Sequence, residues 1–231
     1  MTYVISLAMT KGGVGKTTTI QCISSELRAR GMRILGLDAD PESRLKAWAD
    51  QRNDPEFVVI DGINEQNLRE TVRTHAADYD VVFIDLAGFG NLTMLYAFGA
   101  SDLVLIPVLT SAMDRDAASR TYAVVTEAME NLRHAAPARL FLNRTPAAIK
   151  PRVLKHMRLE LEAEGLPLLP IELIDRTPLV EMTWLGLGPA EMDQSNKSVL
   201  NATQNVRALT DCILSELGRV ELNPGIPRKG D

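Results

Sequence analysis

The chain has 231 residues, of which 45% are hydrophobic, and its formal net charge is -5. It is therefore long enough for one α/β domain with a sizeable core. An acidic protein has no general basic field that would draw it to nucleic acid or anionic lipid, so any such contact requires a local patch. No apolar run approaches the ~18 residues of a membrane span, and the sequence starts with a strand-like run, so we expect a cytoplasmic protein without membrane attachment.

Short apolar runs alternate along the chain with amphipathic segments of helical length. Strands are expected at residues 4–9, 34–37, 57–60, 81–86, 103–108 and 139–142. Helices are expected at residues 17–30, 42–52, 65–77, 114–134, 151–164, 178–185 and 199–217. This alternation predicts a single doubly wound, mostly parallel sheet with helices on both faces, in one domain over residues 1–218. Residues 219–231 are polar and contain two prolines, which predicts a flexible tail.

A glycine-rich loop, KGGVGKTT at residues 11–18, lies between the first expected strand and the first expected helix. Its glycines let backbone amides turn onto phosphate oxygens, and the helix N-terminus adds a partial positive charge. Lys16 is placed to reach the outer phosphates, and the Thr17 hydroxyl is placed to ligate magnesium. The loop therefore predicts a nucleoside triphosphate site.

The loop departs from the strict phosphate-loop pattern, because Thr10 stands where that pattern has its first glycine and Lys11 follows it. With its front lysine it resembles the deviant Walker A loop of the ParA/MinD family of dimeric ATPases. The resemblance implies a P-loop NTPase fold, ATP and Mg²⁺ as cofactors, and a Lys11 that reaches the nucleotide of the partner subunit, so that Lys11 and Lys16 both serve catalysis. It also implies nucleotide contacts from Gly12, Gly13, Val14, Gly15, Lys16, Thr17 and Thr18. The alternative is a glycine-rich turn in an unrelated domain.

Two carboxylates, Asp38 and Asp40, follow the second expected strand, at the edge where open α/β sheets bind ligands. Buried carboxylates are costly unless a cation or hydrogen bonds compensate them. The segment Asp-x-Asp-Pro resembles the family's switch I, which implies that Asp40 positions or activates the attacking water and that Asp38 supports the magnesium shell. The alternative, which is compatible with the first, is that Asp40 caps a helix with Pro41 at its first position.

The strand before Asp85 resembles a Walker B strand, which implies that Asp85 binds magnesium. The sequence then departs from the family, because residues 86–90 are LAGFG where partition ATPases have a proline-containing switch II. Gly88 and Gly90 still suit a mobile loop that senses the γ-phosphate. This departure leaves the subfamily open.

Asn143 and Arg144 end the last expected strand and resemble the family's adenine-contacting pair. The amide of Asn143 presents both a donor and an acceptor to a purine edge, and the Arg144 guanidinium can stack on the base. The alternative is a loop asparagine beside a solvated arginine.

The stretch from Arg144 to Arg158 contains no acidic residue and is the clearest basic patch on an otherwise acidic chain. Its cations recur at steps of three opposite an apolar side formed by Leu154, Met157 and Leu161. They form either a solvated helix face or a surface for the phosphate backbone of DNA. The candidate DNA contacts are Lys150, Arg152, Lys155 and Arg158, joined by Arg176 and Arg207 if a dimer brings them together.

The resemblance implies an ATPase that closes into a sandwich dimer with ATP and hydrolyses it slowly until a ParB-like or other partner stimulates it. Its implied role is partition of plasmid or chromosomal DNA through non-specific DNA binding, with nucleoid association in the ATP state.

A conjugation or cargo-positioning relative, such as the virulence ATPases that bring transfer DNA to a secretion channel, is the alternative. A MinD-like protein is disfavoured, because residues 219–231 contain no amphipathic membrane helix. A P-loop ligase has no motif here, and Cys22 and Cys212 are misplaced for an iron–sulfur reductase.

Overall fold

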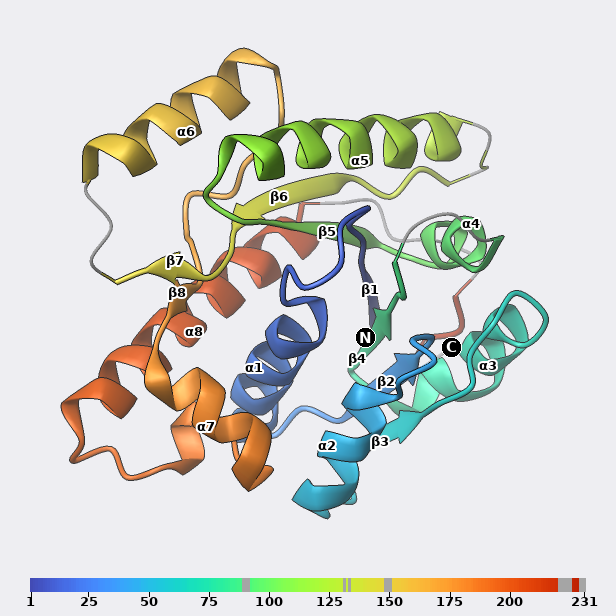
Figure 1. Cartoon of the computed structure of the whole chain (residues 1–231). Coiled ribbons are helices and arrows are strands. Elements are labelled where there is room, and N and C mark those ends of the chain that lie inside the picture. The colour runs from blue at the N-terminus through green and yellow to red at the C-terminus, as the bar shows by residue number, and fades with distance from the viewer. Residues whose placement is uncertain (89–91, 131, 133, 148–150, 220–225, 229–231) are drawn as a thin grey trace.

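Six parallel strands form the central sheet of the computed structural model, in the order β3-β2-β4-β1-β5-β6 (Figure 1). The structure describes residues 1–88, 92–130, 132, 134–147, 151–219 and 226–228. The strands are rich in buried Val, Ile and Leu, as expected where helices cover both faces of a parallel sheet. Their bounds are β1 Tyr3–Leu7, β2 Ile34–Asp38, β3 Phe57–Ile60, β4 Val81–Asp85, β5 Leu103–Val108 and β6 Ala138–Leu142.

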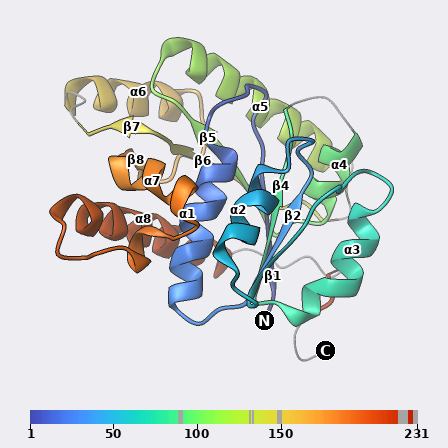
Figure 2. The same cartoon turned by 60° about the horizontal axis from the view of Figure 1, so that its bottom comes forward.

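Helices cover both faces of this sheet, and Figure 2 shows the two layers from a second direction. One hydrophobic cluster joins the sheet to α1 Lys16–Ala29, α2 Arg44–Arg52, α7 Thr177–Leu185 and α8 Lys197–Leu217. The other joins it to α3 Leu68–His75, α4 Leu92–Gly99, α5 Ala112–Glu130 and α6 Pro151–Ala163. Short 3₁₀ helices span Ala76–Asp78 and Pro189–Glu191. The predicted doubly wound α/β fold is confirmed.

The sheet register brings the carboxylates of two strands together at one edge. Asp38, which ends β2, pairs directly with Asp85, which ends β4. The neighbouring strand β1 leads into the glycine-rich loop and α1. Because the carboxyl ends of parallel strands share one edge, three ligand-binding segments that are distant in sequence meet there.

The structure contains elements that the sequence pattern did not predict. Helix α4 was missed because its eight residues are apolar on nearly all sides, so they show no helical periodicity. Two short strands, β7 Thr145–Pro146 and β8 Ile174–Asp175, pair in parallel beyond the end of β6. They are too short to give a periodic signal, yet they bring Asp175 to within 3.7 Å of the Arg144 guanidinium.

Residues 226–228 make contacts that a flexible polar tail would not make. Ile226 is buried in the hydrophobic cluster on the α5 side of the sheet. Arg228 donates to the buried carboxylate of Asp102 at 2.8 Å, near the start of β5. This part of the chain therefore returns to the sheet, at the edge opposite the carboxyl ends. Among the described residues, no helix combines the length and apolarity needed to cross a membrane.

Candidate nucleotide-binding site

The loop between β1 and α1 is shaped to expose backbone amides. Gly13 and Gly15 have φ values of 75° and 87°, in the left-handed region that favours glycine. A Cβ on Gly15 would lie 2.8 Å from Nδ2 of Asn143, so a side chain at this position would collide with the segment that follows β6. No side chain among the described residues caps the start of α1, and its first turn contains no acidic residue. The N-terminal amides of α1 are thus left for an anion.

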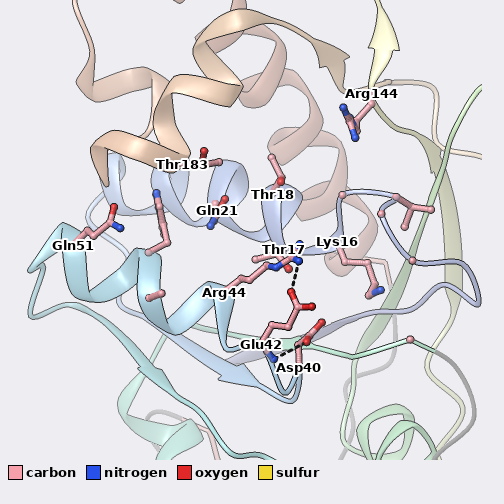
Figure 3. A pocket seen from close by; sticks show the side chains of 17 residues that line it. Lys16, Thr17, Thr18, Gln21, Asp40, Glu42, Arg44, Gln51, Arg144 and Thr183 are labelled. Atoms are coloured by element: carbon pink, nitrogen blue, oxygen red, sulfur yellow. Dashed lines mark hydrogen bonds and ion pairs between the residues drawn. The ribbon is translucent and has the colours of Figure 1, made fainter.

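A cavity of about 630 Å³ lies directly over this loop (Figure 3). Its walls come from the loop, from Asp40 and Arg44 on the β2–α2 side, and from Arg144 after β6. Thr183 of α7 closes another side. The cavity therefore combines the predicted loop with side chains from three later segments, and its volume suits a nucleotide.

Lys16 supplies a cation at the base of the cavity. Its side chain is largely buried, with 9% of the residue exposed. Burial lowers the pKa of Lys16, while the carboxylates of Asp85 and Asp40 act in the opposite direction. A phosphate beside the ammonium would favour its charged form further. The attraction between a triphosphate and Lys16 would therefore offset the free-energy cost of burying both charges.

Thr17 and Asp85 form the part of the site that suits a magnesium ion. The Thr17 hydroxyl donates to Oδ2 of Asp85 at 2.6 Å, and the other carboxylate oxygen, Oδ1, is buried without a partner among the described residues. Burial, reinforced by nearby Asp38, raises the pKa of Asp85 to about 7, although the Thr17 bond opposes this. A hydroxyl beside an unpartnered carboxylate oxygen is a hard oxygen donor set, and such donors fit Mg²⁺.

Asp38 holds the start of α2. Its oxygens accept backbone N–H groups from Asp40 at 3.1 Å, from Leu45 at 3.0 Å and from Lys46 at 3.1 Å. Burial raises the pKa of Asp38, and these three bonds oppose the shift. The carboxylate thus compensates the unpaired amides of the first helical turn. Its predicted place in the magnesium shell remains a prediction, supported by its position beside Asp85.

Asp40 does not cap α2, so the capping alternative for Asp40 is wrong. Its Oδ1 accepts the N–H of Glu42 at 3.0 Å in a local turn, and Pro41 lies outside the helix, which starts at Arg44. The carboxylate lines the cavity instead (Figure 3). Arg44, which sequence reasoning did not select, also lines the cavity and pairs with Glu42.

Lys11 is turned toward its own subunit. Its Nζ forms an ion pair with Oδ1 of Asp114 at 2.6 Å, at the start of α5. The Asp114 side chain is 5% exposed and also accepts bonds from Ser111, whereas 45% of the Lys11 side chain is exposed. Sequence reasoning missed Asp114. The only signal in the sequence was that Asp114 is an acidic residue in the first turn of a helix. Acidic residues are common at this position, so the pattern does not predict an ion pair with Lys11.

The amide of Asn143 has partners other than a purine. It is buried, and its Nδ2 donates to the carbonyl of Val14 at 2.7 Å and to Oγ1 of Thr19 at 3.3 Å. Its Oδ1 accepts the N–H of Arg144 at 3.0 Å. Asn143 therefore supports the phosphate loop from behind. Of the predicted adenine pair, Arg144 has the freer side chain, because about half of that side chain is exposed at the rim.

Within one subunit, the predicted DNA contacts that the structure describes do not form one surface. Arg158 pairs with Glu172, and Arg207 pairs with Glu26 on the opposite face of the sheet. The Arg176 side chain is partly buried at the start of α7, and Lys150 lies outside the described residues. Arg152 and Lys155 remain as exposed cations on α6. The apolar side of that helix packs as expected, with Met157 and Leu161 buried and Leu154 partly so.

The other predicted switch region is described only in part. Gly88 borders the cavity, whereas Phe89 and Gly90 lie outside the described residues. The site nevertheless has a complete phosphate loop, a buried lysine and a strand-end aspartate on a parallel sheet. Together these features define a P-loop nucleoside triphosphatase, and the front lysine is typical of its deviant Walker A class.

Comparisons with known proteins agree with this class. A family model described as "VirC1 protein" matches residues 1–219. The chain is 28% identical to "Protein ParA" of Rhizobium radiobacter over 93% of this chain and 97% of that protein. It is 30% identical to "Maintenance of carboxysome distribution protein A" of Halothiobacillus neapolitanus over 72% of this chain and 77% of that protein. The chain therefore belongs to the VirC1 family, within the ParA/MinD family of ATPases.

Solved structures support the fold. The Cyanothece McdA(D38A)–ATP complex superposes with a TM-score of 0.73 at 16% identity, covering 92% of this chain and 96% of that chain. A putative plasmid partition protein of Borrelia burgdorferi B31, bound to AMPPNP, gives a TM-score of 0.69 at 19% identity, over 94% of this chain and 100% of that one. Identities this low establish a shared architecture, and the residue roles rest on the site itself.

Proposed function

We propose that this protein is a ParA-like positioning ATPase, which binds ATP with Mg²⁺, dimerises around the nucleotides and hydrolyses ATP slowly until a partner protein stimulates it. The observation that supports this most directly is the convergence of free α1 amides, Lys16 and the unpartnered Asp85 oxygen on one edge of the sheet. Fixed cations and dipoles at this position stabilise a triphosphate without reorganisation. The relatives named ParA and McdA make a positioning role the best-supported choice.

In the proposed mechanism the loop amides and Lys16 hold the β- and γ-phosphates. Thr17 and Asp85 would hold Mg²⁺, which supplies charge neutralisation at the phosphates when bound. Asp40 lines the same cavity, and among the described residues its carboxylate accepts one hydrogen bond, from the backbone N–H of Glu42 to Oδ1. Its carboxylate is thus placed to orient a water and to accept its proton during attack on the γ-phosphate.

The dimer depends on Lys11 in this proposal. Lys16 already serves the phosphates of its own subunit, so a second lysine at the front of the loop is available to the partner's nucleotide. For this, Lys11 must leave Asp114. Dimerisation would then exchange an ion pair within one subunit for a contact with the triphosphate of the other, which makes the dimer sensitive to nucleotide state.

The proposed cargo is DNA, bound non-specifically through the exposed cations of α6 when ATP joins two subunits, with nucleoid association in that state. Two patches on one dimer bind with higher avidity than one. A transfer-DNA role is the second candidate, because the VirC1 family model matches along residues 1–219. Both roles require a stimulating partner protein, ParB-like in the first.

The ATP site is tested by Lys16→Ala. Removing the buried cation should abolish micromolar ATP binding in calorimetry, because no other lysine side chain among the described residues lines the cavity. Lys46→Ala is the matched control, since Lys46 lies on α2 and pairs with Asp50 outside this cavity. Unchanged ATP affinity in Lys16→Ala would contradict the proposed function.

A further inference from the structure

Gln21 is a buried polar side chain that the site described so far does not use. It lies on α1 and is only 4% exposed. Its Oε1 has no hydrogen-bond partner among the described residues. The side chain lines the large cavity between Thr18 and Gln51 (Figure 3). A buried amide oxygen without a partner is costly, and the Gln21 side chain borders a ligand cavity, so a ligand group in that cavity is the candidate partner of the amide.

A second, smaller cavity of about 190 Å³ adjoins the large one. Its walls are largely apolar, with Leu173, Ile174 and Leu179 among them. It shares Thr18, Arg144 and Thr183 with the large cavity, so the two spaces meet at these residues. An apolar recess beside a phosphate site suits a flat base, whereas the junction between the two spaces suits the group that links base and phosphates.

We propose that the Gln21 amide forms a hydrogen bond with a ribose hydroxyl of the bound nucleotide and so selects ribonucleotides over deoxyribonucleotides. Gln21 lies three residues after Thr18 and therefore on the same side of α1. With phosphates on the loop and a base in the smaller cavity, the sugar lies at the junction beside Thr18 and Thr183. This inference rests on the proposed ATP site.

A sugar hydroxyl fits the Gln21 side chain better than the amino group of a base does. A hydroxyl both donates and accepts, so it pairs with a glutamine amide whichever way the amide is turned. An exocyclic amine only donates. A site built to bond a hydroxyl rejects the analogue that lacks it, because the buried amide is then left unpaired.

The test is calorimetry of the full chain with Mg²⁺ and three ligands: ATP, 2′-deoxy-ATP and 3′-deoxy-ATP. The parent protein should bind one deoxy analogue about fivefold more weakly than ATP, which corresponds to one neutral hydrogen bond. Gln21→Met, which keeps the side-chain length without the amide, should bind ATP about fivefold more weakly and lose the discrimination. Gln51→Met is the matched control on the exposed wall of the same cavity, and it should keep the discrimination.

Two results would overturn the inference: a parent protein that binds ATP and both deoxy analogues equally, or a Gln21→Met variant that still discriminates. Gln21→Glu is a second test variant for the case that Gln21→Met does not fold. The glutamate carboxylate still accepts a hydrogen bond, so this variant should retain the discrimination at lower overall affinity. A parent that binds none of the three nucleotides would instead contradict the proposed ATP site. Failure of the inference and failure of the proposed function are therefore distinguishable.

Discussion

Two aspartates of the site, Asp38 and Asp40, have different roles because they have different hydrogen-bond partners. Asp38 and Asp40 are two residues apart, yet Asp38 has both oxygens occupied by backbone amides, and Asp40 borders the cavity. The difference arises because Asp38 ends a buried strand beside the first turn of α2. Of these neighbouring carboxylates, Asp38 stabilises the start of α2, and Asp40 is the candidate catalytic group.

Asp40→Ala should bind ATP normally and lose nearly all turnover, because the carboxylate is proposed to act on water and not on phosphate. We expect ATP affinity within about twofold of the parent and a turnover lower by at least ~10²-fold. Equilibrium binding and phosphate-release assays measure the two quantities. Glu42→Ala is the control, since Glu42 also lines the cavity. Parental turnover in Asp40→Ala would remove the catalytic assignment.

Asp85 should make the nucleotide-free protein less stable as pH rises. Its folded-state pKa of about 7 lies above the ordinary value of 3.8, so the folded protein binds the extra proton between these values. The stability that this proton contributes is present at low pH and is lost as pH rises through about 7. Asp85→Asn, which cannot ionise, should therefore be stabilised relative to the parent above this pH.

Thermal unfolding without nucleotide or Mg²⁺ at about pH 6 and about pH 8 provides the measurement. The parent should lose several degrees more than Asp85→Asn between the two conditions. Asp61→Asn serves as the control, because Asp61 is exposed. An identical pH response in parent and Asp85→Asn would show that Asp85 stays ionised in the folded protein.

At the scale of the elements, α6 provides the proposed DNA-binding surface. Its inner side packs on the sheet, and two of its outer cations, Arg152 and Lys155, are exposed. A third, Arg158, is neutralised by Glu172. Such a surface is small for one subunit, so binding should require the ATP-bound dimer and should weaken steeply with salt.

Charge reversal in Arg152→Glu/Lys155→Glu should abolish ATP-dependent binding of non-specific duplex DNA while ATP affinity stays unchanged. The control is Arg73→Glu/Lys197→Glu, which makes the same change in net charge at exposed positions on α3 and α8. Fluorescence anisotropy with ATP and with ADP, at two salt concentrations, measures the effect. DNA binding that survives the α6 reversal would show that α6 is a solvated face.

At the scale of the whole molecule, Lys11 and Asp114 connect the nucleotide loop to dimerisation. Lys11→Ala should bind ATP as a monomer and fail to dimerise, because Lys16 alone serves the phosphates of its own subunit. Sedimentation velocity with ATP, combined with a binding assay, measures both properties. A normal ATP dimer in Lys11→Ala would refute a role of this lysine between subunits.

Asp114→Asn tests whether the ion pair within one subunit opposes the dimer. Loss of the charge should release Lys11 and strengthen ATP-dependent dimerisation by about two- to fivefold, the range of a partly exposed ion pair. Asp116→Asn is a matched control two residues further along α5, where Asp116 is exposed and pairs with Arg115. A weaker dimer in Asp114→Asn would mean that Asp114 orients Lys11 in the dimer instead of restraining it.

The sequence by itself determined the alternating α/β fold, the phosphate loop and the strand-end aspartates, because these depend on local periodicity, glycine geometry and strand termini. It could not determine which polar atoms face one another. Asn143, Asp38 and Lys11 have partners that lie up to 129 residues away in the chain. The sequence likewise does not show that Oε1 of Gln21 has no partner among the described residues. Only the tertiary structure decides such pairs, since hydrogen bonds and ion pairs depend on distances between side chains that the order of residues does not fix.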